Sequence, residues 1–316
     1  MAVYTDIKSN ELEAFLTHYN LAPLFLYEGI TEGVENSNFL LQTQAGPYIL
    51  TLYEKRVRKD DLPFFLGLMQ FLANKGISCP QPVQRRDGTL IGSLANRPAA
   101  LFSFLNGIWT RKPSIPHCQA VGRALAKLHL VGRDFSMKRK NPLSVLGWRP
   151  LWEACRIKAK RFPSHVLVEI DAELDFLEKK WPDHLPTGVI HADLFPDNVF
   201  FLKTQLSGLI DFYFACNDAF AYDLAICLNA WCFEKDGSYN MTKSCALLSA
   251  YYKERSLEKD ELAMLPLLAR GAAMRFFLTR LYDLFYIPDS GLVIKKSPQD
   301  FLNRIRFFRK VSALGH

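Results

Sequence analysis

Apolar and polar residues alternate at strand spacing over much of the first hundred positions. Three β-rich runs separated by glycine-bearing turns predict a small antiparallel sheet, and GTLIGSLANRPAALFSFLNG, which ends at Gly107, predicts further strands. Two other stretches have helical spacing and carry acidic residues at or near their first turn, a typical start signal. The three runs are residues 24–33, 36–46 and 47–55, and the two predicted helices are residues 9–19 and 60–76.

The pattern changes to helical periodicity beyond this region. Two short apolar runs between residues 189 and 212 interrupt the helices and predict a strand pair. The sequence therefore predicts a two-lobed α+β fold, with a small β-rich lobe over residues 1–103 and a large, mainly helical lobe over 104–316. Ligands favour clefts between such lobes. The helical stretches are residues 118–132, 148–161, 166–181 and nearly all of the chain from about 222.

Polar side chains stand at the ends of the two apolar runs in VIHADLFPDNVFFLKTQLSGLIDF, residues 189–212. Asp193, Asn198 and Asp211 form a set of hard oxygen donors, which suits Mg²⁺ and is poorly suited to transition metals. The spacing His-x-Asp-x-x-x-x-Asn resembles the catalytic loop of kinases, where the Asp is the base, the Asn binds Mg²⁺ and a later Asp holds metal at the phosphates. We therefore predict Asp193 as the base, with Asn198 and Asp211 as metal ligands.

Two explanations compete for this stretch. Asp and Asn favour turns, so an Asx-rich turn without chemistry is the alternative. The full spacing, followed by a strand-like NVFF and by GLIDF at hairpin distance, arises rarely by chance. Asp197 follows Pro196 and is expected to fix the turn. His191 is expected to support the site by hydrogen bonding to the loop backbone or to the region of Asp211.

Composition limits the classes of protein to be considered. The 316 residues are 49% apolar and 22% charged, as in ordinary globular proteins. No apolar run is long enough to span a bilayer, and no secretory signal is visible. The seven scattered Cys predict reduced thiols in a cytoplasmic protein. The formal charge of +7 suits solvated helix faces and a polyanionic ligand such as a nucleotide. We expect no nucleic-acid partner and no membrane partner.

The motifs together resemble a known family. HADLFPDN, GLIDFYFACND, YDLA and a helix that ends in LAKLH are similar to the aminoglycoside-phosphotransferase-like branch of the protein-kinase-like fold. GVENSNF, YILTLYE, NAWCF and RFFLTRLYD extend the resemblance along nearly the whole chain. FYFACND and RLYD resemble in particular the homoserine kinases of that branch. The resemblance implies ATP and Mg²⁺ as cofactors and transfer of phosphate to the hydroxyl of L-homoserine, a step of threonine biosynthesis.

Two features of the N-terminal lobe depart from the general kinase pattern. Thr51 stands where kinases place the Lys that touches the phosphates, and the following helix has no Glu to pair with such a Lys. The resemblance implies that Thr is a feature of the homoserine-kinase group. The loop 29–38 lacks a full glycine-rich motif, and an ordinary hairpin turn is the alternative to a phosphate-binding loop. The candidate nucleotide contacts are Gly33, Asn36 and Ser37 in this loop, and Phe102 and Phe104 in the segment LFSFLNG, which would offer backbone hydrogen bonds to adenine.

Homoserine carries a carboxylate and an ammonium besides its hydroxyl. Arg is the natural partner of the carboxylate, because its planar fork binds both oxygens. The helix LPLLARGAAMRFFLTRLYDLF offers Arg270, Arg275 and Arg280, but successive pairs lie about 140° apart, so the three cannot all face one pocket. We predict Arg275, which stands among apolar residues, and Arg280 as substrate contacts. A solvent-facing or ion-paired Arg, such as Arg280 with Asp283, is the alternative.

Two further Asp residues complete the predicted site. Asp218 is predicted to bind the ammonium, and Asp223 to support the site by capping the helix YDLAICLNAWCF. Other substrates of the branch need other surroundings: choline or ethanolamine calls for aromatic or acidic groups, and an aminoglycoside calls for an acidic cleft. A protein kinase is disfavoured by DFY in place of DFG. A nucleotide-binding pseudokinase is the remaining alternative, which the presence of the base and both metal ligands disfavours.

Overall fold

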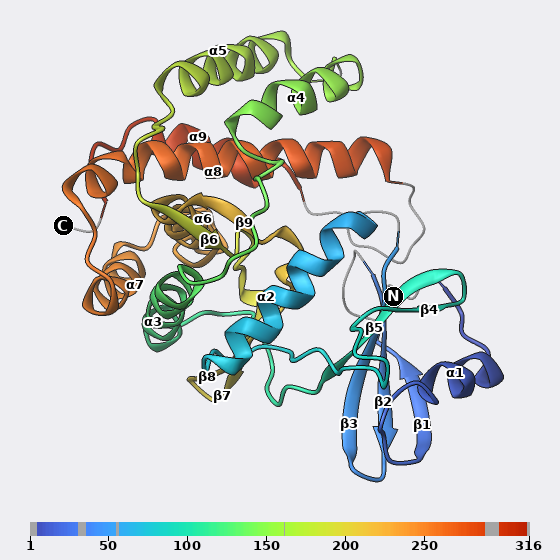
Figure 1. Cartoon of the computed structure of the whole chain (residues 1–316). Coiled ribbons are helices and arrows are strands. Elements are labelled where there is room, and N and C mark those ends of the chain that lie inside the picture. Colours follow the sequence, from blue (N-terminus) through green and yellow to red (C-terminus); the bar gives the residue numbers. More distant parts are fainter. Residues whose placement is uncertain (1–4, 31–35, 55–56, 161, 288–296, 315–316) are drawn as a thin grey trace. The chain divides into compact units, whose positions relative to one another are not determined.

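The protein divides into two compact units. Unit 1 contains the N-terminal residues up to 107 together with the short segment 207–213, and unit 2 contains the remaining described residues from 108 onward (Figure 1). The structure is a computed structural model, and it describes residues 5–30, 36–54, 57–160, 162–287 and 297–314.

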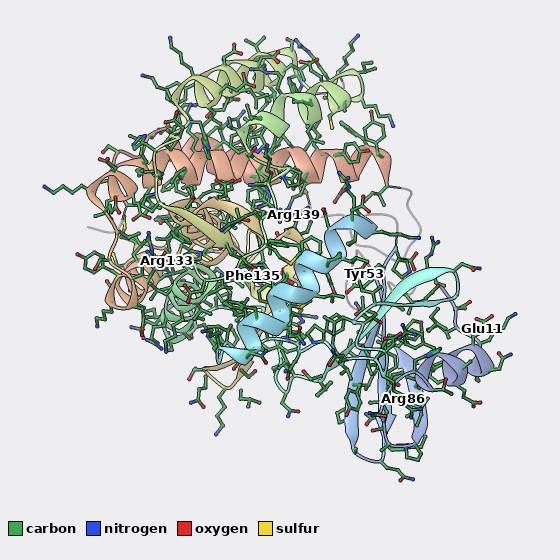
Figure 2. All side chains as sticks on the ribbon, in the orientation of Figure 1. Glu11, Tyr53, Arg86, Arg133, Phe135 and Arg139 are labelled. Carbon is green, nitrogen blue, oxygen red and sulfur yellow. The ribbon has the colours of Figure 1, made fainter. Side chains whose placement is uncertain are left out.

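A five-stranded antiparallel sheet forms unit 1, in the order β1-β2-β3-β5-β4 (Figure 1). Alternate residues of β2 are buried, and Phe39 and Leu41 pack with Leu50 of β3 and Phe15 of α1 in one core. A period of two places one face of a strand in a core, which is why these runs were predictable. The exposed Glu11 of α1 points away from the sheet (Figure 2). The bounds are α1 Ser9–Leu16, β1 Leu24–Gly29, β2 Ser37–Thr43, β3 Gly46–Leu52, β4 Gly92–Leu94 and β5 Arg97–Ser103.

The helix α2 (Leu62–Asn74) follows a short 3₁₀ turn, η1 (Lys59–Asp61), and is buried along most of its length. Pro63 lies in its first turn, where a missing backbone N–H is tolerated. The ring of Phe65 meets that of Tyr213 edge-on, with centroids 5.7 Å apart. The Tyr213 hydroxyl lies 3.1 Å from that of Tyr53, the buried residue that follows β3 (Figure 2). Phe65, Tyr213 and Tyr53 therefore form a cluster of aromatic rings and hydroxyl groups at α2, the helix in which kinases carry the Glu that this chain lacks.

The long helix α8 is the central helix of unit 2 and packs against α4, α6 and α9 (Figure 1). Contrary to the expectation from the sequence, it is long and apolar enough to cross a membrane, but 67% of its most apolar window is buried inside the protein. Such burial is typical of a core helix. The helices match the stretches predicted from periodicity. Their bounds are α3 Ile115–Gly132, α4 Val145–Ala159, α5 Ser164–Lys180, α6 Phe220–Trp231, α7 Met241–Glu254, α8 Lys259–Tyr286 and α9 Gln299–Phe308.

Two short two-stranded sheets carry the polar motif between α5 and α6. β6 (Thr187–Ile190) pairs with β9 (Cys216–Ala219) antiparallel, and β7 (Val199–Leu202) pairs with β8 (Gln205–Leu209). A turn after β6 leads through the 3₁₀ segment η2 (Pro196–Asn198) into β7. The β7–β8 hairpin was predicted. The pairing of β6 with β9 was not, because β9 is only four residues long and lacks an alternating pattern.

Candidate active site

Residues 191–193 form a strained turn at the end of β6. Ala192 has φ 64°, in the left-handed region that costs a residue with a Cβ roughly 1–2 kcal/mol. Asp223 holds the turn from α6: its Oδ2 accepts from the backbone N–H of His191 at 2.7 Å, and its Oδ1 accepts from that of Ala192 at 2.9 Å. Such strain persists where the surroundings over-determine it, commonly at functional sites.

The position of Asp223 corrects its expected role as a helix cap. α6 begins at Phe220 with Ala219 at its N-cap, and no side chain caps it. Asp223 lies within the first turn, is fully buried, and reaches back to the end of β6. A buried carboxylate needs hydrogen-bond donors, and the two backbone N–H groups of the turn supply them.

A buried chain of hydrogen bonds continues from Asp223 into α3 and α7. His129 Nε2 lies 3.1 Å from Asp223 Oδ2, and His129 Nδ1 lies 2.7 Å from the hydroxyl of Tyr251. Arg255 Nη1 donates to that hydroxyl at 3.2 Å and pairs with Glu261. These residues were not among the predicted site residues. Only the motif LAKLH, which ends at His129, pointed to this helix.

Burial and hydrogen bonding act on the pKa values of this pair. Burial lowers the pKa of His129, against the hydrogen bond and charge of Asp223. Burial alone would raise the pKa of Asp223, but the hydrogen bonds from His129 and from the backbone N–H of His191 act against burial, so that the pKa is lowered. A neutral imidazole therefore faces a carboxylate at pH 7. We assign the proton to Nε2, which donates to Asp223, while Nδ1 accepts from Tyr251.

Arg275 holds the same turn from the other side. Its side chain is only 2% exposed, and its Nη1 donates to the backbone oxygen of Ala192. The guanidinium also packs over the rings of Phe276 at 4.5 Å and Phe214 at 5.5 Å. In the structure Arg275 supports the turn through its Nη1, and its predicted contact with the substrate stays a prediction. Arg275 and Asp223 together bind the carbonyl and the N–H of one residue.

Asp193 and Asn198 are joined by hydrogen bonds across the turn. Asn198 Nδ2 donates to the backbone oxygen of Asp193 at 2.8 Å and to its Oδ2 at 3.2 Å. The backbone N–H of Asp193 donates to His191 Nδ1 at 3.3 Å. Because the amide nitrogen of Asn198 turns toward Asp193, its Oδ1 points elsewhere, and it accepts no hydrogen bond from the residues described in the structure.

Asp211 follows β8 in unit 1 and shares the unusual backbone of Ala192, with φ 63°. The other non-glycine residues with positive φ, within the described ranges, are Ala95, Asn96 and Lys203, which lie between paired strands. Both polar ends of the motif are therefore strained. No group of three or more His, Cys, Asp or Glu placed to hold a metal occurs in the described part of the chain, so the predicted metal site depends on an amide. Carboxylate and amide oxygens fit Mg²⁺.

Thr51 stands at the position where kinases have the phosphate-binding Lys, and its hydrogen-bond partner is the uncharged side chain of Asn38. Its Oγ1 donates to Asn38 Oδ1 at 2.8 Å, and the two residues face one another in the register of β2 and β3. The side chain of Thr51 is buried. The sheet thus fills this position with a hydroxyl–amide hydrogen bond and leaves no charge there to be neutralised.

The predicted phosphate loop lies at the start of β2. Asn36 and Ser37 are buried and both contact Glu54: its backbone N–H donates to Asn36 Oδ1 at 3.3 Å, and Ser37 Oγ donates to its Oε1 at 2.7 Å. Their side chains thus serve the sheet, and a phosphate contact through their backbone stays a prediction. Gly33 lies outside the described residues.

The predicted adenine segment begins inside the sheet. Phe102 is buried in β5, whereas Phe104 follows the strand and is 38% exposed. The backbone N–H of Ser103 donates to the backbone oxygen of Gln81 at 2.9 Å. Phe102 pairs with Ile49 within the sheet. Backbone hydrogen bonds to adenine therefore stay a prediction, and the residues after β5, from Phe104 to Gly107, are the best placed to make them.

Asp218 lies in β9 and Arg280 in α8. Asp218 Oδ2 accepts from Asn141 Nδ2 at 2.7 Å, and burial raises its pKa against this hydrogen bond. Arg280 lies 3.9 Å from Asp300, and its guanidinium stacks over Phe301 at 4.2 Å. The predicted role of Asp218 at the substrate ammonium stays a prediction.

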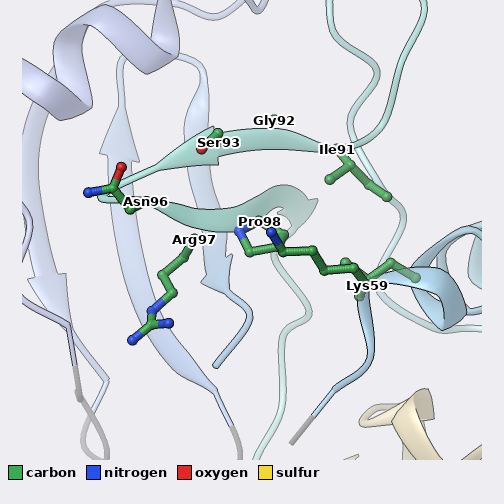
Figure 3. A pocket seen from close by; sticks show the side chains of 8 residues that line it. Lys59, Ile91, Gly92, Ser93, Asn96, Arg97 and Pro98 are labelled. Atoms are coloured by element: carbon green, nitrogen blue, oxygen red, sulfur yellow. The ribbon is translucent and has the colours of Figure 1, made fainter. Parts of the chain in front are cut away.

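A cavity lies in each unit, and neither is lined by a predicted site residue that the structure describes. In unit 1 a cavity of about 220 Å³ lies by the β4–β5 hairpin, where Lys59 reaches toward Pro98 (Figure 3). In unit 2 a cavity of about 330 Å³ is lined in part by Arg270 and Arg309, which share the buried Glu173. Arginines committed to a buried carboxylate indicate a structural cluster.

Known proteins resemble the chain along nearly its whole length. The model of the phosphotransferase enzyme family matches residues 27–257. A homoserine kinase from Rhizobium etli is 61% identical over 99% of this chain and 98% of its own, and one from Brucella canis is 58% identical over 99% and 96%. A solved amicoumacin kinase in complex with AMP-PNP, Ca²⁺ and Ami has a TM-score of 0.70 at 18% identity, over 96% of this chain and 92% of its own. This likeness confirms the predicted two-lobed α+β fold.

Proposed function

The chain belongs to the homoserine kinases of the phosphotransferase enzyme family, and we propose that the turn 191–198 together with Asp211 performs their chemistry. The enzyme phosphorylates homoserine with ATP, a step of threonine biosynthesis. Identity of 61% over nearly the full chain is the observation that carries this conclusion. It confirms the family predicted from the motifs. The roles of individual residues are our proposal.

Asp193 is the base in this proposal. The homoserine hydroxyl oxygen attacks the γ-phosphorus in line, and the new O–P bond forms as the bond between γ-phosphorus and the bridging oxygen breaks, which releases ADP. The hydroxyl proton passes to the Asp193 carboxylate. The support comes from the turn, where Asp223, Arg275 and His191 hold three successive backbone positions. A carboxylate fixed before the reaction needs no reorganisation during it.

Asn198 and Asp211 would hold Mg²⁺. The amide of Asn198 supports this, because its Nδ2 is used by Asp193 and its oxygen remains for a cation. Asp211 adds a carboxylate on a strained backbone. When bound, the ion offsets the negative charge of the phosphates. Carbonyl and carboxylate oxygens are the donors that a hard divalent cation prefers.

We also place the enzyme in the cytoplasm. All seven Cys are free, and six of them are buried. Burial raises the pKa of Cys79 to about 12 and those of Cys118 and Cys155 to about 11, so the reactive thiolate is suppressed. A chain with this many unpaired thiols suits a reducing compartment.

A coupled ADP-release assay with Mg²⁺ tests the activity against homoserine, serine, threonine, choline, ethanolamine and kanamycin. We expect turnover with homoserine alone. Turnover of choline or kanamycin in its place would contradict the substrate while keeping the roles of Asp193, Asn198 and Asp211. ATP binding without turnover of any alcohol would favour a pseudokinase and contradict both.

A further inference from the structure

Two arginines meet on one aromatic ring in unit 2. Arg280 comes from α8 and Arg304 from α9, and their Cζ atoms lie 4.2 Å and 4.4 Å from the centroid of the Phe301 ring. The sum of these two distances is the upper limit for the separation of the Cζ atoms. Phe301 is buried and lies in an aromatic cluster with Phe276 and with Phe195, which belongs to the turn that carries Asp193. Two positive charges are thus held near each other and near this turn.

Among the residues that the structure describes, neither arginine has a carboxylate within 3.5 Å. Arg280 lies 3.9 Å from the carboxylate of Asp300, whose side chain is 65% exposed, and Arg280 Nη1 also donates to the Ser297 backbone oxygen at 3.2 Å. Arg304 Nη1 donates to the backbone oxygen of Asn229 at 2.6 Å. Arg304 makes no ion pair with any residue that the structure describes. Its Nε and Nη2 donors are therefore available to a ligand.

Both arginine side chains are partly shielded from solvent, and that of Arg280 is 16% exposed. Loss of hydration lowers the pKa of both Arg280 and Arg304 to about 10. The charge of Arg280 lowers that of Arg304 further, whereas Asp300, Asp193 and Asp197 act on Arg280 in the opposite direction. Both guanidinium groups remain charged at pH 7 and repel each other. Partly dehydrated like charges are costly, and an anion bound between them removes this cost.

The dimensions of homoserine fit such a place. Its hydroxyl must reach Asp193 in the proposed mechanism. Its carboxyl carbon is four bonds from the hydroxyl oxygen, which is roughly 5 Å in an extended molecule. The carboxylate must therefore lie within a short distance of Asp193, and Arg280 is near enough for its charge to interact with that residue.

We propose that Arg280 and Arg304 together bind the carboxylate of homoserine and so select an amino acid over the corresponding amino alcohol. The proposal rests on the homoserine kinase activity stated above. Two planar groups on one ring present several N–H donors in fixed planes, which suits the two oxygens of a carboxylate. Arg280 was predicted from the sequence as a substrate contact, whereas Arg304 was not.

Paired substrates test this proposal. L-Homoserine and 3-aminopropan-1-ol share the hydroxyl and the amine, but the second has hydrogen in place of the carboxylate. We expect the wild-type kcat/KM for homoserine to exceed that for 3-aminopropan-1-ol by about 10²-fold or more, because a site built for a polar group rejects the analogue that lacks it. Arg304→Gln should raise the KM for homoserine by about 10–100-fold with kcat within about threefold, and leave 3-aminopropan-1-ol unaffected.

Arg306→Gln is the matched control, since Arg306 lies on the same helix but pairs with Glu169 at 2.7 Å. Its kinetics with both substrates should equal those of the wild type. Equal losses for both substrates in Arg304→Gln would show a structural role and overturn the proposal. If thermal unfolding shows that Arg304→Gln does not fold, Arg280→Lys and the wild-type comparison decide: equal wild-type use of the two substrates overturns the carboxylate site. A wild type without homoserine turnover would contradict the activity itself.

Discussion

Two buried charged side chains bind Ala192, the residue before Asp193 in the turn. Ala192 offers its N–H to Asp223 and its carbonyl to Arg275, so a buried anion and a buried cation bind opposite ends of the same residue. Both charged groups bind backbone atoms of the turn, and the left-handed conformation of Ala192 is the local cost of orienting the next side chain.

Replacement of the proposed base gives a direct test at this scale. Asp193→Ala should lower kcat by about 10²–10⁴-fold, the usual effect of a lost general base. Binding of ATP, measured by calorimetry, should be nearly unchanged, because the γ-phosphate does not need this proton acceptor in order to bind. A loss of tenfold or less would remove Asp193 from the role of base.

Asp223→Asn tests the support of the turn. The substitution keeps the shape but removes a charge and places an amide nitrogen opposite N–H donors. We expect the free energy of unfolding to fall by about 3 kcal/mol or more, as when one partner of a buried charged network is lost, and kcat to fall with it. Asp183→Asn is the control, because the Asp183 side chain is fully exposed, and it should change stability by less than about 0.5 kcal/mol. Equal stability of the two variants would contradict the anchoring role.

At the scale of elements, the geometry of α8 directs its three arginine side chains to different neighbours. Its three arginines were predicted not to face one pocket, and in the structure they have different partners: Arg270 pairs with Glu173 of α5, Arg275 donates to the turn after β6, and Arg280 packs on Phe301 of α9. A five-residue spacing turns each side chain by about 140° relative to the previous one. One helix thus contacts α5, the turn after β6 and the proposed carboxylate site.

The close packing of α3 on α7 makes a prediction for Gly122. A Cβ at this position would lie 2.3 Å from the backbone oxygen of Leu247, which cannot move without shifting α7. Gly122→Ala should therefore lower the free energy of unfolding by about 1–3 kcal/mol, the cost of overpacking, in spite of the better helix propensity of Ala. Chemical denaturation measures this change.

The same variant should also affect activity, because α3 carries His129 and α7 carries Tyr251, which are joined 2.7 Å apart in the network behind the turn. Arg123→Ala, at the exposed neighbour on α3, is the control and should behave like the wild type within about 0.5 kcal/mol. A Gly122→Ala protein as stable as this control would show that the helices can separate without cost.

Across the whole molecule, local patterns were easier to predict than partners. Strands, helices and the His-x-Asp-x-x-x-x-Asn turn follow from periodicity and spacing, which are properties of short segments. The partners of Asp223 and Arg275 are far away in sequence. Neighbouring residues therefore could not show whether Asp223 caps a helix or anchors a turn, nor that Arg275 binds the backbone of that turn. Arg304 was missed for the same reason, because its significance depends on sharing Phe301 with Arg280.

The buried His129–Asp223 pair makes the stability of the molecule depend on pH. The pKa of His129 is lowered in the folded state, so below its usual value of about 6.5 the unfolded chain binds a proton that the folded protein does not. The free energy of unfolding should therefore fall as the pH drops below about 6.5 toward the folded pKa.

Asp223 acts in the same direction at lower pH, because its pKa is also lowered, and its contribution is lost as the pH falls below about 3.9. Denaturation at pH 7, 6 and 5 measures the first part. His129→Gln removes the titrating group and should make this dependence shallower than in the wild type. An equal slope for the two proteins would show that the pKa of His129 is the same in the folded and unfolded states, which contradicts a pKa lowered by burial.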